Sequence, residues 1–332
     1  MPTMVDVARL ARVSVSTVSH VVNGTRNVEP ATRGKVERAI REIGYRPDAL
    51  ARAMKRSRTD SVGLVVSDPA EPAFAEMVRG VEMAAAARGL TLLLAATGED
   101  PGRERASVQA LISRRVDGLV LAPCDRDTTS LIGAGGAGSS APVPAVLMDR
   151  LHPVDLDQVG VKNAEAMAEL VRHLRSRGHR RLALVAGDLG VPTLRERHDS
   201  FVAAAGQGAV VLAGDRDARG ACATTLGVLG QAAPPTAVVA ASTPLAAGAL
   251  EAIQTRGLRV PGDIALAAFD GFPYPDLLEP RITTVHQPAI EVGRQALELL
   301  VDRIENPGAP TRTLRLTATL ALRASTDRTV GA

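Results

Sequence analysis

The feature that most constrains the fold of this 332-residue chain is a long alternation of short apolar runs and helical stretches. Apolar runs separated by helical patterns are typical of buried parallel strands joined by crossover helices. The runs fall into two sets of four, at residues 61–66, 91–95, 118–121 and 145–148, and then at 181–185, 209–213, 237–240 and 264–269. Two sets of strand–helix–strand units predict two doubly wound α/β lobes.

A different pattern occupies the first 46 residues, where we expect three short helices. Thr3 and Ser14 are good N-caps for the first two, and Gly24 suits the end of the second. The third should run over about residues 30–43. The positions expected to face a small core are Val5, Ala8, Leu10 and Ala11, then Val18, Val21 and Val22, then Val36, Ala39, Ile40 and Ile43. Three helices at this spacing predict a helix-turn-helix domain.

The other face of the second helix carries side chains with donors, acceptors or methyl groups near the helix start, where recognition helices touch DNA. These are Val15, Ser16, Thr17, Ser19 and His20. Residues 1–58 hold twelve Lys and Arg against five acids, a net charge of +7, so the rest of the +3 chain carries −4. Basic charge concentrated in these first 58 residues favours phosphate contact, although a solvated basic surface would explain the charge alone.

The head resembles the LacI/GalR family of bacterial transcriptional regulators in the segments VDVARLARVSVSTVSHVVNG and ATRGKVERAIREIGYRPDALARAM. The body continues the resemblance, in the order typical of that family, with VGLVV, FAEMVRGVE, RRVDGLVLAP, RGHRRLALVAG, PPTAVVAA, GLRVPGDIALAAFD and ITTVHQP. The resemblance covers about residues 3–325. It implies an N-terminal all-α helix-turn-helix domain and a periplasmic-binding-protein-like α/β body of two doubly wound lobes.

Domain boundaries follow from the two patterns and the resemblance together. We expect a DNA-binding domain at 1–46, a hinge helix and linker at 47–58, and an effector-binding and dimerisation body at 59–332. The first lobe should comprise about 59–159 and 286–308, and the second about 160–285 and 309–326. The chain would then cross between the lobes near 158–162, 284–288 and 307–311.

The resemblance implies contacts with a double-stranded DNA operator in both the head and the hinge. The matching residues are Thr3, Ser14, Val15, Ser16, Thr17, Ser19, His20, Asn23, Arg26 and Tyr45 in the head, and Pro47, Ala51 and Met54 in the hinge. Met54 stands where the family has a leucine that wedges into the minor groove, and an unbranched apolar side chain can do the same. Packing of Met54 on the body is the alternative.

Two departures from the family lie on the DNA side. Arg12 replaces a turn glycine, at a cost of about 1 kcal/mol if its backbone is left-handed. His20 replaces a common arginine, so one bidentate guanine contact is lost and the operator should differ from the commonest half-site.

In open α/β sheets a ligand lies beyond the carboxyl ends of the strands, so the cleft between the lobes is the expected effector site. By resemblance its contacts are Ala73, Phe74, Asp149, Arg197, Ser242, Thr243 and Asp270. A carboxylate at Asp149 and a guanidinium at Arg197 suit hydroxyl or carboxylate groups of a ligand. A salt bridge across the cleft would also explain both.

The cleft departs from the family at several positions. Ser242 and Thr243 replace an Asn-Asp pair, and Gly271 replaces an acid. The loop that usually reads Asn-Pro-aromatic-Phe is Glu71-Pro72-Ala73-Phe74, so one stacking ring is absent. A plain neutral monosaccharide is therefore a less certain effector.

Other functional classes are disfavoured by simple observations. The two cysteines, Cys124 and Cys222, lack CxxC partners, which argues against a zinc site or a disulfide framework. The absence of a signal segment or an 18-residue apolar run predicts a cytoplasmic protein that does not enter a membrane. We expect no catalytic residues, metal or cofactor. The lack of leucine heptads near the end favours a homodimer over a tetramer.

The prediction is therefore a sequence-specific transcriptional regulator, a repressor, that binds a pseudo-palindromic operator as a dimer. A small-molecule effector in the cleft, sugar-like in character, would control its DNA affinity by allostery. Two alternatives remain open. The chain could be a DNA-binding dimer with no effector, or a cytosolic sugar- or nucleotide-modifying enzyme.

Overall fold

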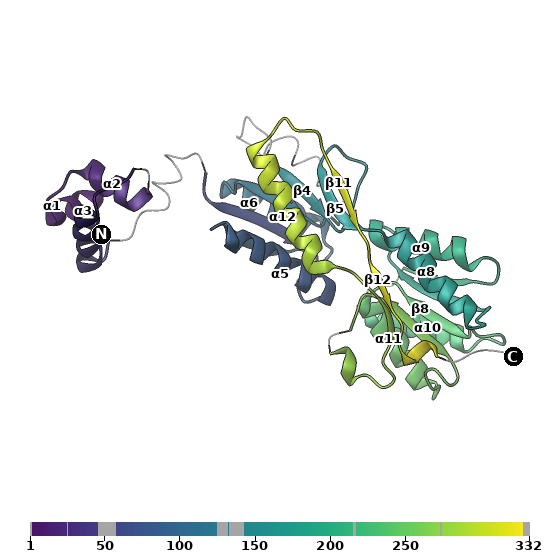
Figure 1. Ribbon diagram of the computed structural model, residues 1–332. Coiled ribbons are helices and arrows are strands. Elements are labelled where there is room, and N and C mark those ends of the chain that lie inside the picture. The colour runs from purple at the N-terminus through teal and green to yellow at the C-terminus, as the bar shows by residue number, and fades with distance from the viewer. Residues whose placement is uncertain are drawn as a thin grey trace. The chain divides into compact units, whose positions relative to one another are not determined.

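The computed structural model describes residues 2–24, 26–45, 58–124, 132, 143–214, 217–272 and 274–327. The chain divides into two compact units, Met1–Thr59 and Asp60–Ala332, called here the head and the body. Each is drawn in Figure 1, and each is treated by itself. The predicted hinge residues Pro47, Ala51 and Met54 lie outside the described residues.

The head contains the three predicted helices, and their caps are those expected from the sequence. They are α1 (Met4–Ala11), α2 (Val15–Asn23) and α3 (Pro30–Ile43). Thr3 forms a capping box with Asp6, in which each residue accepts a bond from the backbone N–H of the other. Ser14 Oγ accepts from the backbone N–H of Thr17 at 3.1 Å. Arg12 has φ 55° and ψ 47°, so this non-glycine residue does adopt the left-handed conformation and bears its cost of about 1 kcal/mol.

The buried face of α1 differs from the prediction. Val7, Ala8 and Ala11 are buried, whereas Val5 is 51% exposed and Leu10 is 42% exposed. At 100° per residue the three buried side chains form one stripe, and Val5 and Leu10 lie on opposite flanks of it, so both were wrongly assigned to the core. The buried residues of the head core are Val7, Ala8, Ala11, Val18, Val36, Ala39 and Tyr45, and the predicted Val21, Val22, Ile40 and Ile43 are partly buried against them.

The first lobe of the body is a six-stranded sheet in which every pairing is parallel. Its order is β11-β5-β4-β3-β1-β2. The strands are β1 (Ser61–Val66), β2 (Thr91–Ala96), β3 (Gly118–Leu121), β4 (Ala145–Met148), β5 (Asp157–Val161) and β11 (Thr313–Leu316). Its helices are α5 (Pro72–Ala87), α6 (Pro101–Ser113) and α12 (Ala289–Glu305). Figure 1 shows α12 beside α5.

The second lobe repeats this plan with the order β12-β10-β9-β8-β6-β7, and only β12 is antiparallel to its neighbour. Its strands are β6 (Leu182–Gly187), β7 (Val210–Ala213), β8 (Ala237–Ala240), β9 (Ala265–Phe269), β10 (Thr283–His286) and β12 (Thr319–Ala321). Its helices are α8 (Asn163–Ser176), α9 (Pro192–Ala205), α10 (Ala218–Leu229) and α11 (Thr243–Thr255), with 3₁₀ turns η1 (Pro275–Leu277) and η2 (Ala324–Thr326). The predicted fold class of a helical head and two doubly wound lobes is confirmed.

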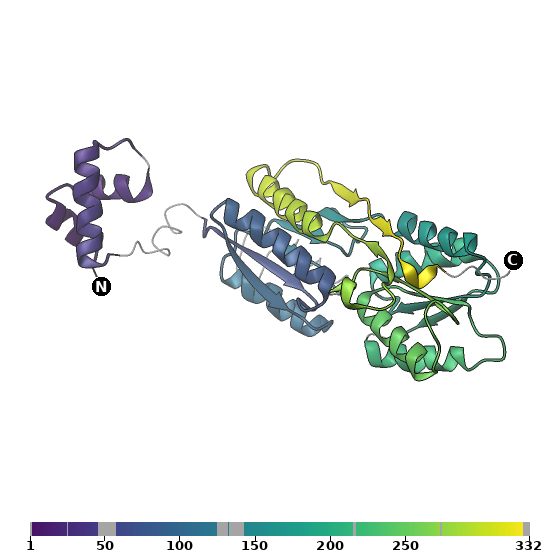
Figure 2. The same ribbon diagram turned by 60° about the horizontal axis from the view of Figure 1, so that its bottom comes forward.

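The expected lobe boundaries need two corrections. The segment 157–161, most of which was expected to be a crossing, is strand β5 of the first sheet, so the first crossing lies at residue 162. The apolar pattern over residues 312–320 predicts one last strand, but the structure has two: β11 pairs with β5 in the first lobe, and β12 pairs with β10 in the second. The third crossing therefore lies at 317–318 and not at 307–311. Figure 2 shows this last segment, in yellow, passing from one lobe to the other.

Two glycines allow α5 and α12 to pack in close contact. A Cβ on Gly80 would overlap the carbonyl oxygen of Ile290, and one on Gly293 would overlap that of Met77. The two backbones meet where neither helix carries a side chain. Any larger residue at either position would force the helices apart.

Candidate DNA interface and ligand cavity

The head presents a group of hydroxyls at the N-terminus of α2. Ser14, Val15 and Ser16 are exposed, while Thr17, Ser19 and His20 are partly buried. The Ser14 Oγ lies 2.8 Å from both Ser16 Oγ and Thr17 Oγ1, so one cap orients three hydroxyls. A helix N-terminus with free N–H groups and adjacent hydroxyls suits phosphate oxygens and base edges.

The remaining candidate DNA contacts of the head differ in their exposure to solvent. Thr3 and Arg26 are exposed, so both are available to a partner. Tyr45 is only 8% exposed and packs in the head core, with its N–H donating to the carbonyl of Ile40 at 3.0 Å. The structure thus gives Tyr45 a packing role that the sequence analysis did not assign. Asn23 is the last residue of α2, and its side chain is outside the described part.

A cavity with roughly 720 Å³ of empty space, part of it open to solvent, lies between the two lobes of the body. Residues from both lobes line it, at the carboxyl ends of their strands, as predicted. The described lining residues are Glu71, Ala73, Phe74, Met77, Glu99, Asp149, Arg150, Asp188, Val191, Thr193, Leu194, Arg197, Ser242, Pro244, Leu245, Asp270 and Gln287.

Arg197 is the centre of a buried polar network on the second-lobe side of this cavity. Its Nη1 donates to the carbonyl of Ala241 at 2.7 Å and to Asp270 Oδ2 at 3.2 Å. Its Nε donates to Asn163 Oδ1 at 3.0 Å. The side chains of Arg197 and Asp270 are 3% and 6% exposed, so this is a buried ion pair with several supporting hydrogen bonds.

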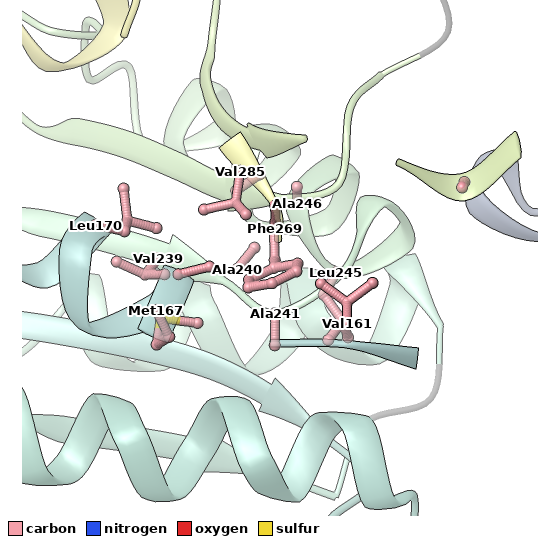
Figure 3. Close-up of a cluster of buried hydrophobic side chains, with 14 of the residues drawn as sticks. Val161, Met167, Leu170, Val239, Ala240, Ala241, Leu245, Ala246, Phe269 and Val285 are labelled. Carbon is pink, nitrogen blue, oxygen red and sulfur yellow. The ribbon is translucent and has the colours of Figure 1, made fainter. Parts of the chain in front are cut away.

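The Arg197 guanidinium packs on an aromatic ring of the apolar core of the second lobe. Its Cζ lies 3.6 Å from the centroid of the Phe269 ring, a close cation–π contact. Figure 3 shows Phe269 within a cluster that includes Ala240, Ala241 and Leu245. Because this packing holds the Phe269 ring in place, the ring also fixes the position of the guanidinium at the cavity wall.

Arg150 forms the corresponding pair on the first-lobe side. Its Nη1 donates to Glu99 Oε2 at 2.8 Å, and its Nη2 donates to the other oxygen of the same carboxylate. The guanidinium also lies 5.6 Å from the centroid of the Phe74 ring. Arg150 is therefore held in a bidentate pair, with only 5% of its side chain exposed.

Two carboxylates of the first lobe have no such partner. Asp149 is 7% exposed, and neither its side chain nor that of Glu71 forms a hydrogen bond or a salt bridge with the described residues. Burial raises the pKa of Asp149 to about 6, against the opposing effect of Arg197 and Arg150. Burial, followed by the charges of Asp270 and Asp149, raises the pKa of Glu71 to about 7.

Asp149 and Asp270 occupy equivalent places in the two lobes. Asp149 follows β4 and donates its N–H to Val159 at 2.8 Å, and Asp270 follows β9 and donates to Val285 at 2.9 Å. Both have left-handed backbones, with φ 66° and φ 71°. Asp tolerates this conformation better than most residues, and such positions often occur at functional sites.

Of the seven predicted effector contacts, six line the cavity: Ala73, Phe74, Asp149, Arg197, Ser242 and Asp270. Thr243 does not, because its Oγ1 donates to the carbonyl of Gly271 at 3.1 Å and the residue is 6% exposed. Glu99 and Gln287 were missed. Glu99 follows β2, so the rule that placed the other residues at strand ends could have found it.

A second network joins the lobes beside the cavity. Arg315 of β11 forms a two-bond ion pair with Glu196 of α9, with its Nη2 2.7 Å from Oε1 and its Nη1 3.1 Å from Oε2. Glu196 also accepts from Asn163 Nδ2 at 3.0 Å. Since Asn163 accepts from Arg197, this network is continuous with the one in the cavity.

Within the described part of the chain, no helix is long and apolar enough to cross a membrane. The same residues contain no group of three or more His, Cys, Asp or Glu arranged to hold a metal ion.

Comparison with known proteins gives consistent matches over nearly the whole chain. Residues 3–48 match the family described as bacterial regulatory proteins, lacI family, and residues 171–326 match a periplasmic binding protein-like domain. The chain is 35% identical over 332 residues to a ribose operon repressor of Haemophilus influenzae, with 98% of each chain covered.

Solved structures show the same architecture. A Lac repressor dimer bound to operator and the anti-inducer ONPF matches with a TM-score of 0.86 at 27% identity, over 98% of this chain and 99% of that one. A complex of the transcriptional regulator CelR with cellobiose matches with a TM-score of 0.72 at 33% identity, over 98% and 100%.

Proposed function

Because the chain belongs to the LacI family of bacterial regulatory proteins, we propose that its head recognises an operator while its cavity senses a small molecule. The protein is a DNA-binding transcriptional repressor. The observation that carries the proposal is that one chain joins a helix-turn-helix head to a two-lobed body with a polar cavity between the lobes.

We assign the base and phosphate contacts to the exposed start of α2. Ser14, Val15 and Ser16 are exposed there, and Thr17, Ser19 and His20 continue the same face. Arg26 and Thr3 would contact the phosphate backbone. Two heads of a homodimer would occupy two half-sites of a pseudo-palindrome. Pro47, Ala51 and Met54 remain proposed hinge contacts.

The effector would bind in the cavity and change the angle between the lobes, because both lobes supply lining residues. Arg197 and Asp149 offer a donor fork and a free carboxylate to hydroxyl groups. The relatives named for ribose and cellobiose support a sugar-like ligand. A coupling of about 1 to 3 kcal/mol between ligand and DNA would suffice for regulation.

We also propose a cytoplasmic location, because a regulator must reach the operator DNA. We infer a role without catalysis, because the named relatives are repressors and the two arginines of the cavity are engaged in ion pairs with Asp270 and Glu99.

Selection of binding sites from a random double-stranded DNA library would test the DNA function with the full-length protein. We expect a pseudo-palindrome to be enriched. Ser16→Ala should weaken binding to it about tenfold, or about 1.4 kcal/mol, because one polar contact is lost. Ser176→Ala is the matched control, as this serine is exposed in the body and donates only to the carbonyl of His173. Failure to enrich any sequence would contradict the proposal.

Thermal shift with a panel of pentoses, hexoses and disaccharides would test the sensor. A ligand should raise the melting temperature of the parent protein and weaken operator binding or strengthen it. Asp149→Asn should reduce the shift because the ligand loses a charged contact. The side chain of Asp149 has no partner among the described residues, so a smaller shift would not reflect damage to the fold. A shift that is equal in both proteins would place the ligand elsewhere.

A further inference from the structure

The cavity holds more negative charge than its own cations neutralise. Five acids and two arginines line it. Arg150 is paired with Glu99, and Arg197 is paired with Asp270. Neither arginine is left to balance the carboxylates of Glu71 and Asp149.

These two carboxylates are accompanied by a third acceptor that has no donor. The Oε1 of Gln287 is buried without a hydrogen-bond partner, although its Nε2 donates to Asp270. Gln287 is 4% exposed and lines the same cavity. Glu71, Asp149 and Gln287 thus present acceptor atoms to a space in which the protein supplies them with no donor.

The surroundings make this shortage of donors costly. The cavity walls include the apolar side chains of Phe74, Met77, Leu194 and Leu245. A carboxylate in such surroundings loses solvation, and a cation, several hydrogen bonds or protonation of the carboxylate offsets that loss. A neutral ligand could supply hydrogen bonds, but it would leave the two charges unbalanced.

We propose that the effector is a polyhydroxylated amine, such as an amino or imino sugar, whose protonated nitrogen binds at Glu71 and Asp149. The inference rests on the proposed sensor function and names its ligand class. An ammonium group supplies donors and no acceptor, so it matches carboxylates that lack donors. Hydroxyl groups on the remainder of the ligand would reach Gln287, Ser242 and the guanidinium of Arg197.

Glu71 is the residue that gives this chain its preference. It is the N-cap of α5, yet its side chain makes no capping hydrogen bond, so its carboxylate does not stabilise the start of the helix. Glu76 on the same helix is exposed and outside the cavity, and it provides a matched control.

Isothermal titration of the full-length protein at pH 7.5 with matched pairs of ligands tests the proposal. Suitable pairs are D-glucose with D-glucosamine, D-glucose with 1-deoxynojirimycin, and D-ribose with 1,4-dideoxy-1,4-imino-D-ribitol. We expect at least one amine to bind tenfold or more tightly than its neutral partner. Glu71→Gln should reduce that preference to threefold or less, whereas Glu76→Gln should retain it.

Three outcomes would overturn the proposal. They are equal or tighter binding of every neutral partner, an amine preference that survives Glu71→Gln, and no binding by any member of the pairs. The circular dichroism spectrum of Glu71→Gln should match that of the parent protein, which excludes misfolding as the cause of a lost preference. Operator selection succeeds or fails separately, so a wrong ligand class is distinguishable from a wrong function.

Discussion

The two sides of the cavity solve the problem of buried charge differently. On the second-lobe side, Asp270 accepts from both Arg197 and Gln287, and the guanidinium rests on Phe269. On the first-lobe side, Asp149 and Glu71 have no hydrogen-bond partner within the described chain. The Arg197–Asp270 pair is complete before any ligand binds, whereas the carboxylates of Asp149 and Glu71 need a ligand to supply their hydrogen-bond donors.

This difference separates stability from recognition. Removing a member of a satisfied buried pair strands its partner and destabilises the fold. Removing an unsatisfied carboxylate relieves a desolvation cost that the fold already bears. Substitutions on the two sides should therefore change the stability of the ligand-free protein in opposite directions.

The largest effect is expected for Asp270→Asn. It removes the charge that balances the buried Arg197, so the free energy of unfolding should fall by about 3 kcal/mol. Urea denaturation of the ligand-free protein measures this change. Asp149→Asn is the matched substitution at the equivalent place in the first lobe and should be neutral or stabilising. Equal losses for both would remove the distinction between the two sides.

Lowering the pH should stabilise the ligand-free body through Asp149 and Glu71. Their pKa values are about 6 and about 7 in the fold, above the ordinary range, so the folded state retains protons that the unfolded state has lost. Stability from these groups is therefore gained as the pH falls from 8 towards 5, on the order of 2 kcal/mol.

The comparison between parent and variant isolates that contribution from all other titrating groups. The difference in unfolding free energy between the parent and Asp149→Asn should widen as the pH rises through 6. A difference that is constant with pH would show that Asp149 titrates normally.

Thr243→Val should lower the free energy of unfolding by about 1 kcal/mol. The change removes the hydroxyl that donates to Gly271 and leaves that carbonyl without this partner. Since Thr243 does not line the cavity, ligand affinity should be unchanged when measured by titration. Loss of ligand affinity without loss of stability would show instead that Thr243 contacts the ligand.

The smallest effect is expected for Glu71→Gln in the absence of ligand. The neutral side chain removes an unbalanced charge that is only partly buried, so stability should rise by up to about 1 kcal/mol. The same urea titration measures it, with Glu76→Gln as the unchanged reference. Destabilisation would mean that Glu71 has a structural partner.

Much of the fold was predictable because buried parallel strands and capped helices leave strong local signals. The bounds of β1, β3, β4 and β8 agree with the apolar runs, and Ser14 caps α2 as expected. The short strands β5 and β10 were missed, since they contain polar residues such as Asp157, whose buried carboxylate forms ion pairs with Arg303 and Arg312.

The site was predictable in position but less so in its detail. Strand ends located Asp149 and Asp270, because sheet topology alone determines where they meet. The sequence could not show that Tyr45 packs inward or that Thr243 bonds to a carbonyl, because both depend on side-chain directions set by residues distant in the chain. Nor could it show which carboxylates are paired.

The hydrogen-bond network around Arg197 reaches each of the three crossings between the lobes. Asn163 directly follows the first crossing, Gln287 lies in the second, and Arg315 precedes the third by two residues. The three connections form the hinge between the lobes, and residues at all three belong to one hydrogen-bond network. A ligand that takes hydrogen bonds from Arg197 therefore changes the hydrogen-bond network at the hinge directly.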